Sequence, residues 1–329
     1  IRKTEDMMGP GIELPAALGT NVPPTNNTDM KTYGWELQIG WRDQIGDFKY
    51  GAKLSLSDSQ SKILRYGNPT GSLSKYVEGE LIGNIYGYTT IGIAKTDEEM
   101  QQHLASLPNG GQSALGSQWA AGDIMYADLN GDGKINNGSY TINDMGDMKK
   151  IGNSTPRFMT GINLDAAYKG WDLQMFWQGV LKRDWWPGDK NMTFWGVTDG
   201  EWWSTSFKEH LDYFRTSENP LGENLNSYYP RPIFNTKNNK SQTRYLQNAA
   251  YMRLKNIQVG YTFPKVWINK LMLQNLRIFV SGENLLTITS LSDTMDPETC
   301  GAGYQSTEQA NGTVYPLAKT ISFGLSVNF

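Results

Sequence analysis

The residues whose types and spacing most clearly suit metal binding lie in a short run between positions 128 and 136, where oxygen-bearing side chains alternate with other residues. A glycine follows the third of them, as in the first half of a calcium-binding loop. The second half departs from that motif, because Ser139 stands where a bidentate carboxylate should close the cage. The candidate calcium ligands are Asp128, Asn130, Asp132, the carbonyl of Lys134, and Asn136.

Two interpretations of this run stay open. Asp144 or Asp147 could supply the missing carboxylate if the loop folds back, and a structural calcium ion would then pin the loop. Alternatively, the run is an Asp/Asn/Gly turn whose side chains accept hydrogen bonds from backbone N–H groups, which needs no metal.

A second group with binding potential consists of aromatic residues in a long polar stretch. Indole rings can stack on sugar rings while the indole N–H bonds a hydroxyl. The same residues also suit the packing of a loop or the centre of a protein interface, and we favour these two roles. The group contains Trp185, Trp186, Trp195, Trp202, Trp203, Tyr228 and Tyr229.

Other catalytic and ligating patterns are missing from the sequence. Cys300 is the sole cysteine, and His103 and His210 are far apart without partners at metal spacing. There is no glycine-rich phosphate loop, no serine nucleophile elbow and no zinc-binding histidine pair. A net charge of −3 from 30 basic and 33 acidic residues gives no reason to expect nucleic-acid binding. We therefore predict that the protein is not an enzyme and requires no cofactor, with structural calcium as the one open case.

The elements that position these residues are amphipathic β-strands, each with one apolar and one polar face. The last eleven residues alternate strictly between apolar side chains, such as Phe323 and Leu325, and polar ones, and the chain ends on Phe329. Runs of about ten residues, the length of a tilted membrane strand, repeat this pattern upstream. The sequence predicts an all-β fold, the C-terminal portion of a large antiparallel transmembrane β-barrel, with about eight strands. The other runs lie at 1–8, 35–41, 48–57, 158–168, 171–178, 257–263 and 276–288.

The connections are short within hairpins and long between them, as in outer-membrane barrels with tight periplasmic turns and extended extracellular loops. This places the C-terminus on the periplasmic side. The alternative interpretation is a secreted soluble β-sandwich module that binds glycans. In a sandwich, side chains such as Trp35, Ile39, Trp171, Leu173, Phe323 and Val327 would share one core, whereas in a barrel they face outward. The predicted long loops span 9–32, 58–157, 181–250 and 289–316.

Several blocks, in this order and spacing, resemble the SusC/RagA family of TonB-dependent outer-membrane transporters from Bacteroidota. The resemblance extends over nearly the whole chain. The blocks are Gly79 with Ile82 and Gly83, Tyr86 to Tyr88, Gly92 and Ile93, Gly122 to Ile124, Asp128 to Ile135, Gly152 and Asn153 with Pro156 and Phe158, Tyr251 to Pro264, and Gly282 to Leu285.

The resemblance implies that residues 1–329 are the C-terminal part of a single barrel domain of about twenty-two strands. The plug domain and the N-terminal strands would lie outside this chain, and contact with the TonB complex would be made through that missing part. It further implies integral residence in the outer membrane of a Gram-negative bacterium, in contact with its lipid. The expected function is active import of oligosaccharides or peptides, together with a SusD-like surface lipoprotein that acts as a lid.

Overall fold

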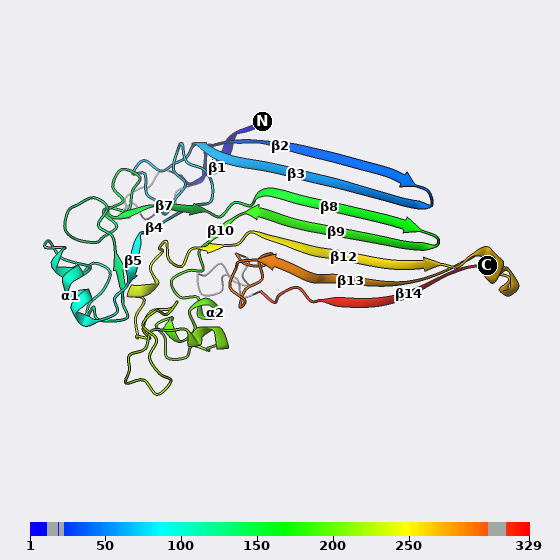
Figure 1. Cartoon of the computed structure of the whole chain (residues 1–329). Coiled ribbons are helices and arrows are strands. Elements are labelled where there is room, and N and C mark those ends of the chain that lie inside the picture. Colours follow the sequence, from blue (N-terminus) through cyan, green and yellow to red (C-terminus); the bar gives the residue numbers. More distant parts are fainter. Residues whose placement is uncertain (12–18, 20–22, 302–313) are drawn as a thin grey trace.

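The computed structural model describes residues 1–11, 19, 23–301 and 314–329. Within these residues, one antiparallel sheet of eight strands forms the long body of the molecule (Figure 1). No described helix is long and apolar enough to cross a membrane. In spatial order the strands are β1 (Arg2–Gly9), β2 (Thr25–Ile45), β3 (Phe48–Arg65), β8 (Arg157–Tyr168), β9 (Trp171–Lys182), β12 (Tyr251–Thr262), β13 (Asn275–Thr289) and β14 (Thr320–Asn328).

The hairpin turns follow from local sequence. β8 and β9 are joined by Lys169 and Gly170, which have φ angles of 44° and 91°. Two successive residues with positive φ match the right-handed twist of the flanking strands, and glycine takes such angles without strain. The short connection predicted between the runs 158–168 and 171–178 is therefore confirmed. The connection between β12 and β13 is longer and contains α3 (Lys265–Ile268) and η5 (Asn269–Leu271).

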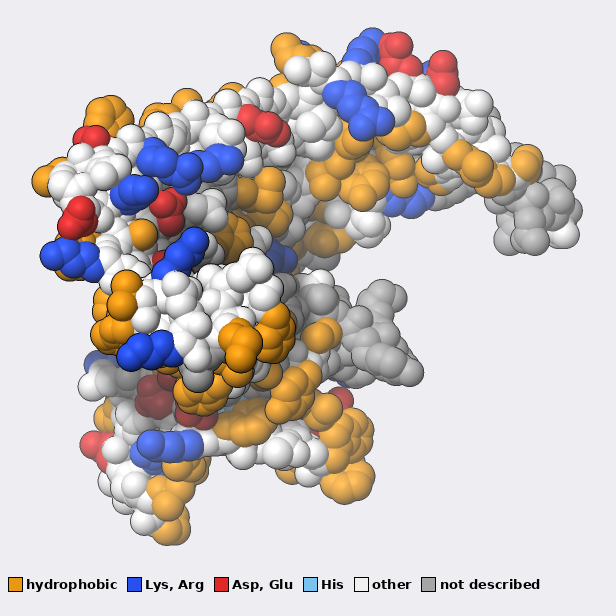
Figure 2. Space-filling view, turned by 90° about the vertical axis from the view of Figure 1, so that its right-hand side faces the viewer, with side chains coloured by type: hydrophobic (Ala, Val, Ile, Leu, Met, Phe, Trp, Pro, Cys, Tyr) orange, Lys and Arg blue, Asp and Glu red, His pale blue; other side chains and the backbone are white. Residues whose placement is uncertain are grey.

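The hairpin turns β2–β3, β8–β9 and β12–β13 lie at one end of the sheet, together with the C-terminus, and the described parts of the long connections lie at the other end (Figure 1). Viewed from the turn end, the molecule forms an open arc around a wide hollow (Figure 2). The prediction of an all-β chain with eight long antiparallel strands and one-sided long loops is confirmed.

The predicted boundaries of the first two loops, 9–32 and 58–157, were too wide. β2 has 21 residues and β3 has 18, so both continue beyond their apolar stretches into polar sequence. The two strands pair with each other as far as Asp29 and Arg65, and these backbone hydrogen bonds hold polar residues that sequence patterning assigned to loops. The loops at 181–250 and 289–316 begin and end within a few residues of their predicted bounds, and part of the latter lies outside the described residues.

The long connections fold together into what we call the loop assembly, which comprises residues 66–156, 183–250 and 290–301. Small two-stranded sheets organise it, namely β4 with β7, β5 with β6, and β10 with β11. Its elements are β4 (Asn84–Tyr88), β5 (Thr90–Ile93), α1 (Asp97–Ala105), β6 (Ile124–Tyr126), β7 (Met148–Asn153), β10 (Asp184–Trp185), α2 (Met192–Trp195), η2 (Gly196–Thr198), η3 (Lys208–Leu211), η4 (Lys237–Asn239) and β11 (Gln247–Asn248).

The main cluster of buried hydrophobic side chains among the described residues lies in the loop assembly. Its buried side chains come from all three long connections, for example Ile124, Trp195 and Met295. Segments far apart in the sequence are thus held in one packed body at the end of the strands. Such a body can present side chains in fixed positions, as a flexible loop could not.

Candidate functional site

One face of the sheet is apolar across neighbouring strands. Ala166, Leu173, Val259, Val280 and Phe323 pair successively from β8 to β14, so the alternation of five strands is in phase. Phe323 is 82% exposed on this face. An ordered row of exposed apolar side chains on regular strands suits contact with lipid rather than water.

Eight apolar side chains of β2, β9 and β14 that a membrane barrel would turn outward lie outside the core. Six of them are exposed and two, Leu173 and Met175, are half-buried. The β-sandwich alternative requires a core that includes Trp35, Trp171 and Phe323, and all three are exposed. The arrangement therefore fits a barrel wall. The exposed six are Trp35, Leu37, Ile39, Ile321, Phe323 and Leu325.

The opposite face of the sheet is polar. Gln38, Ser55, Gly161, Gln178 and Arg253 pair successively across β2, β3, β8, β9 and β12. A hollow of about 710 Å³ lies over the first four of these residues, where small side chains leave room. This face could line an aqueous path.

Aromatic side chains gather near the turn end of the apolar face. The rings of Phe48 and Tyr168 are 6.5 Å apart, and Trp171 lies 5.0 Å from Tyr261, which is 5.1 Å from Phe263. Aromatic girdles of this kind mark the boundary between the hydrocarbon layer and the headgroups in membrane barrels.

Several of the predicted contact aromatics are core residues of the loop assembly. Trp195 is fully buried, its ring centroid lies 4.9 Å from that of Phe194 and 4.8 Å from that of Tyr245, and its indole N–H donates to the Gly188 carbonyl at 2.7 Å. Trp185 is also buried, as is Tyr229. These rings stabilise the loop and cannot meet a ligand in this arrangement.

The other four predicted contact residues reach the surface to different degrees. Trp186 and Tyr228 are partly buried against the core. Trp202 is 79% exposed and Trp203 is 54% exposed, and their rings meet edge to face at 5.2 Å. This pair can be reached from outside the chain, and its role in contacting a substrate or a lid stays a prediction.

A buried ionic cluster joins the first long connection to the second. The Asp123 carboxylate is fully buried and accepts two hydrogen bonds of 2.8 Å from Arg231. Lys237 Nζ lies 2.8 Å from the same carboxylate, and the Asn238 amide donates to it at 2.9 Å. Burial alone would raise the pKa of Asp123, but the hydrogen bonds from Arg231, Asn238 and Lys237 hold it below its usual value. The cluster fixes the relative position of the two connections.

The calcium-like run forms a tight turn. The Asp128 carboxylate accepts hydrogen bonds from Gly131 N at 2.6 Å and Gly133 N at 2.9 Å. Asp132 accepts one from Lys134 N at 3.1 Å. These bonds are those of the metal-free turn, yet they leave further lone pairs on each carboxylate. No three acidic, histidine or cysteine side chains converge as an ion cage within the described residues, so a calcium ion would depend on Asn130, Asn136 and carbonyl oxygens.

The loop does fold back, and it brings Asp147 beneath the run. Asp147 is fully buried and accepts hydrogen bonds from Leu129 N at 2.9 Å and Asn136 N at 2.8 Å. Burial and the nearby Asp128 carboxylate raise the pKa of Asp147 above its usual value. Calcium binding stays a prediction, and Asp147 is the carboxylate that the fold-back brings to the run. Asp144 bonds Ser139 instead.

No family model matches the sequence. Curated relatives do. The chain is 28% identical to TonB-dependent receptor P3 of Formosa agariphila over 349 residues, which covers 99% of this chain and 31% of that protein. It is 22% identical to the TonB-dependent receptor SusC of Bacteroides thetaiotaomicron, with 100% and 29% covered. The chain is therefore similar, over its whole length, to part of these TonB-dependent receptors.

The solved structures agree with this result at the level of the fold. The chain aligns with the RagAB peptide transporter with a TM-score of 0.67 at 18% identity, over 99% of this chain and 32% of the other. RagAB in its closed-closed state gives a TM-score of 0.64. The predicted family resemblance and the predicted barrel fold are both confirmed. The chain spans about a third of the length of these relatives.

Sequence reasoning missed the groups that hold the loop assembly together. Arg231 and Lys237 lie more than a hundred positions from Asp123 along the chain, so no spacing rule could connect them. His210 was dismissed as a metal ligand, and the structure shows it fully packed, with Nδ1 accepting from Phe207 N at 2.9 Å. Its Nε2 lies 3.1 Å from the Phe194 carbonyl.

Proposed function

We propose that this chain forms part of the barrel wall of a TonB-dependent importer in the outer membrane, and that its loop assembly forms part of the importer's extracellular surface. The observation that carries the proposal is the in-phase, two-faced sheet with its apolar face exposed. The apolar face would meet lipid, and the polar face would line the transport path. Residues 1–329 would belong to one barrel domain that is completed by strands outside this chain.

The two ends of the sheet suggest the orientation. Barrels of this class have short periplasmic turns and long extracellular loops. The loop assembly would therefore face the cell exterior, and the hairpin turns and the end of β14 would face the periplasm. Coupling to TonB would require a segment that lies outside this chain.

The cargo would be an oligosaccharide or a peptide, delivered by a SusD-like lipoprotein that covers the loop assembly. The packed core of the assembly supports this idea, because a rigid platform loses little entropy when a lid docks. Trp202 and Trp203 are the exposed anchors that such a lid or its cargo could contact. We assign no catalytic step, since the relatives are receptors.

The test uses the full-length protein in its own outer membrane. Deleting its gene should abolish growth on oligosaccharides or peptides that are too large to diffuse through porins. Complementation with Trp202→Ala/Trp203→Ala should restore normal surface levels but lower uptake, whereas Met192→Ala, a change at another exposed apolar side chain of the same connection, should restore uptake fully. Recovery of the protein in the soluble fraction, or unchanged growth of the deletion strain on all pools, would refute the proposal.

A further inference from the structure

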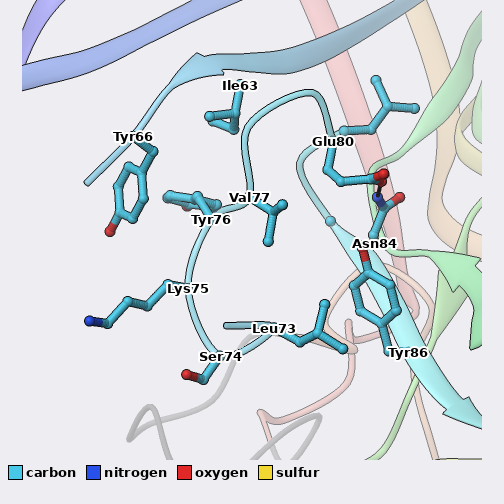
Figure 3. A pocket seen from close by; sticks show the side chains of 12 residues that line it. Ile63, Tyr66, Leu73, Ser74, Lys75, Tyr76, Val77, Glu80, Asn84 and Tyr86 are labelled. Atoms are coloured by element: carbon cyan, nitrogen blue, oxygen red, sulfur yellow. Dashed lines mark hydrogen bonds between the residues drawn. The ribbon is translucent and has the colours of Figure 1, made fainter. Parts of the chain in front are cut away.

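A pocket of about 420 Å³ lies between the end of β3 and the loop of residues 66–86 (Figure 3). This volume falls in the range of small-molecule sites. Ile63, which lines it, is only 3% exposed and has the same parity along β3 as Ser55, with unbroken register between them. The pocket therefore lies over the polar face of the sheet, which the proposed function assigns to the transport path.

The loop that forms the pocket is already ordered by hydrogen bonds within the chain. The Asn68 amide donates to the carbonyls of Ser72 at 2.9 Å and Tyr76 at 3.0 Å, and its oxygen accepts from Ser72 N. At the base, Gly79 N donates to the Ile63 carbonyl at 2.9 Å and Ile63 N donates to the Glu80 carbonyl at 3.0 Å. A ligand would thus enter a formed site without ordering a loop, which lowers the entropic cost of binding.

The charged groups of the pocket are already engaged. The Glu80 carboxylate accepts hydrogen bonds from Lys150 Nζ and from the Asn84 amide, the latter at 2.6 Å. Lys75 has an interaction partner of its own within the chain. A charged ligand would have to compete with these contacts, so the electrostatics favour a neutral one.

The remaining lining combines apolar surface with aromatic rings that carry hydroxyl groups. The rings of Tyr66 and Tyr76 meet edge to face at 5.3 Å, and Tyr76 is 49% exposed. Both tyrosines form hydrogen bonds through their backbone atoms: Tyr66 N donates to the Glu78 carboxylate, and the Tyr76 carbonyl accepts from the Asn68 amide. Leu73 and Val77 add apolar surface beside the rings (Figure 3). A sugar ring presents the same two features, an apolar C–H face and a rim of hydroxyls.

We propose that this pocket binds one or two neutral sugar units of the imported cargo. The inference rests on the proposed function and narrows its substrate class to oligosaccharides. The tyrosine rings would stack on the sugar, and the two hydroxyls would bond its rim. Peptide cargo is the competing outcome, and it would call for a charged or backbone-binding site that this pocket does not offer.

The experiment measures binding to the full-length purified protein in detergent. Saturation-transfer NMR would be run with a panel of neutral disaccharides (maltose, cellobiose, xylobiose and mannobiose) and with a matched panel of dipeptides. We expect transfer to at least one disaccharide. Tyr66→Ala/Tyr76→Ala should weaken its binding at least tenfold, and Tyr76→Phe, which keeps the ring, should weaken it only a few-fold. Tyr315→Ala, at an exposed tyrosine outside the pocket, should change nothing.

Three results would overturn the inference: no disaccharide binds, binding survives in the double tyrosine variant, or dipeptides bind in place of sugars with the same dependence on Tyr66 and Tyr76. An unchanged melting temperature of the variants would confirm that they fold. Growth on the oligosaccharide pool separates this inference from the proposed function. Normal uptake with an unaltered KM in the tyrosine variant refutes the sugar site alone, whereas normal uptake after gene deletion refutes the importer.

Discussion

The sheet and the loop assembly use the same apolar residue types in opposite ways. Phe323 on β14 is 82% exposed, whereas Phe194 in α2 is fully buried and touched by aromatic rings on several sides. The sheet keeps its backbone satisfied by strand pairing and turns its apolar side chains outward, as a structure in lipid must. The loop assembly buries its apolar side chains as a water-soluble domain does.

This contrast means that the two parts should fail for different reasons. A buried aromatic core is sensitive to lost volume, because a cavity remains after truncation. A lipid-facing strand tolerates changes of volume but not charge, because an ion on that face has no water and no partner. Matched substitutions in the two parts test this difference.

The largest effect is expected from Trp195→Ala in the core of the loop assembly. The change removes the ring between Phe194 and Tyr245 and leaves the Gly188 carbonyl without its donor, at a cost of about 3 to 5 kcal/mol. Hydrogen exchange should show residues 183–250 opening while the strands stay protected. Trp202→Ala, at an exposed ring, should shift stability by no more than about 0.5 kcal/mol. Equal effects of the two substitutions would contradict a packed assembly.

A somewhat smaller effect is expected from a charge on the apolar face of the sheet. Leu325→Arg should cost about 2 to 4 kcal/mol if Leu325 lies near the bilayer midplane, and less near an interface. Unfolding of the full-length barrel in lipid vesicles would measure it. Ser322→Arg, on the polar face of the same strand, should have little effect. If both arginines are tolerated equally, the face is not in lipid.

The sheet could be predicted from sequence because its information is local. Phe323 and Leu325 show their common face by their spacing alone, and Lys169 with Gly170 marks a turn within two residues. The extra length of β2 and β3 could not be predicted, since polar residues beyond the membrane keep the strand conformation through pairing and not through an apolar pattern.

The loop assembly escaped prediction because its contacts join distant positions. The pairing of Asp123 with Arg231 depends on two connections packing together, and no local sequence pattern near either residue indicates it. The aromatic cluster was found as a composition, but the sequence could not tell buried Trp195 from exposed Trp202. The fold-back that brings Asp147 to the calcium-like run was foreseen as one option, and only the structure selects it over Asp144.

A moderate, pH-dependent effect is expected at His210. Its Nδ1 accepts from Phe207 N, so the ring is neutral with its proton on Nε2, which donates to the Phe194 carbonyl. Burial lowers the pKa of His210, although hydrogen bonds to backbone and the nearby Glu209 act in the opposite direction. The unfolded chain therefore binds the proton more readily, and stability present above pH about 6.5 should decline as the pH falls toward the lowered pKa.

Hydrogen exchange of residues 196–212 between pH 8 and pH 5 would test this expectation. His210→Gln can keep the donor to Phe194 and does not titrate, so it should flatten the pH dependence of that segment. Burial also lowers the pKa of His103, but His103 is present in both the native chain and the His210→Gln variant. Its contribution therefore cancels when their pH profiles are compared. Identical pH profiles would mean that His210 does not control the segment.

The smallest effect is expected from calcium. With a dissociation constant typical of extracellular modules, about 1 mM calcium should stabilise the loop assembly by about 0.4 to 1.4 kcal/mol. Asp132→Asn is the informative variant, because asparagine retains an oxygen to accept the Lys134 N–H bond and so preserves the turn, but it lacks the charge that a cation needs. Thermal melting with calcium, with magnesium and with a chelator should show a calcium-specific gain in the native chain that the variant loses. Coincident melting curves in all three conditions would leave the run as a hydrogen-bonded turn that binds no metal.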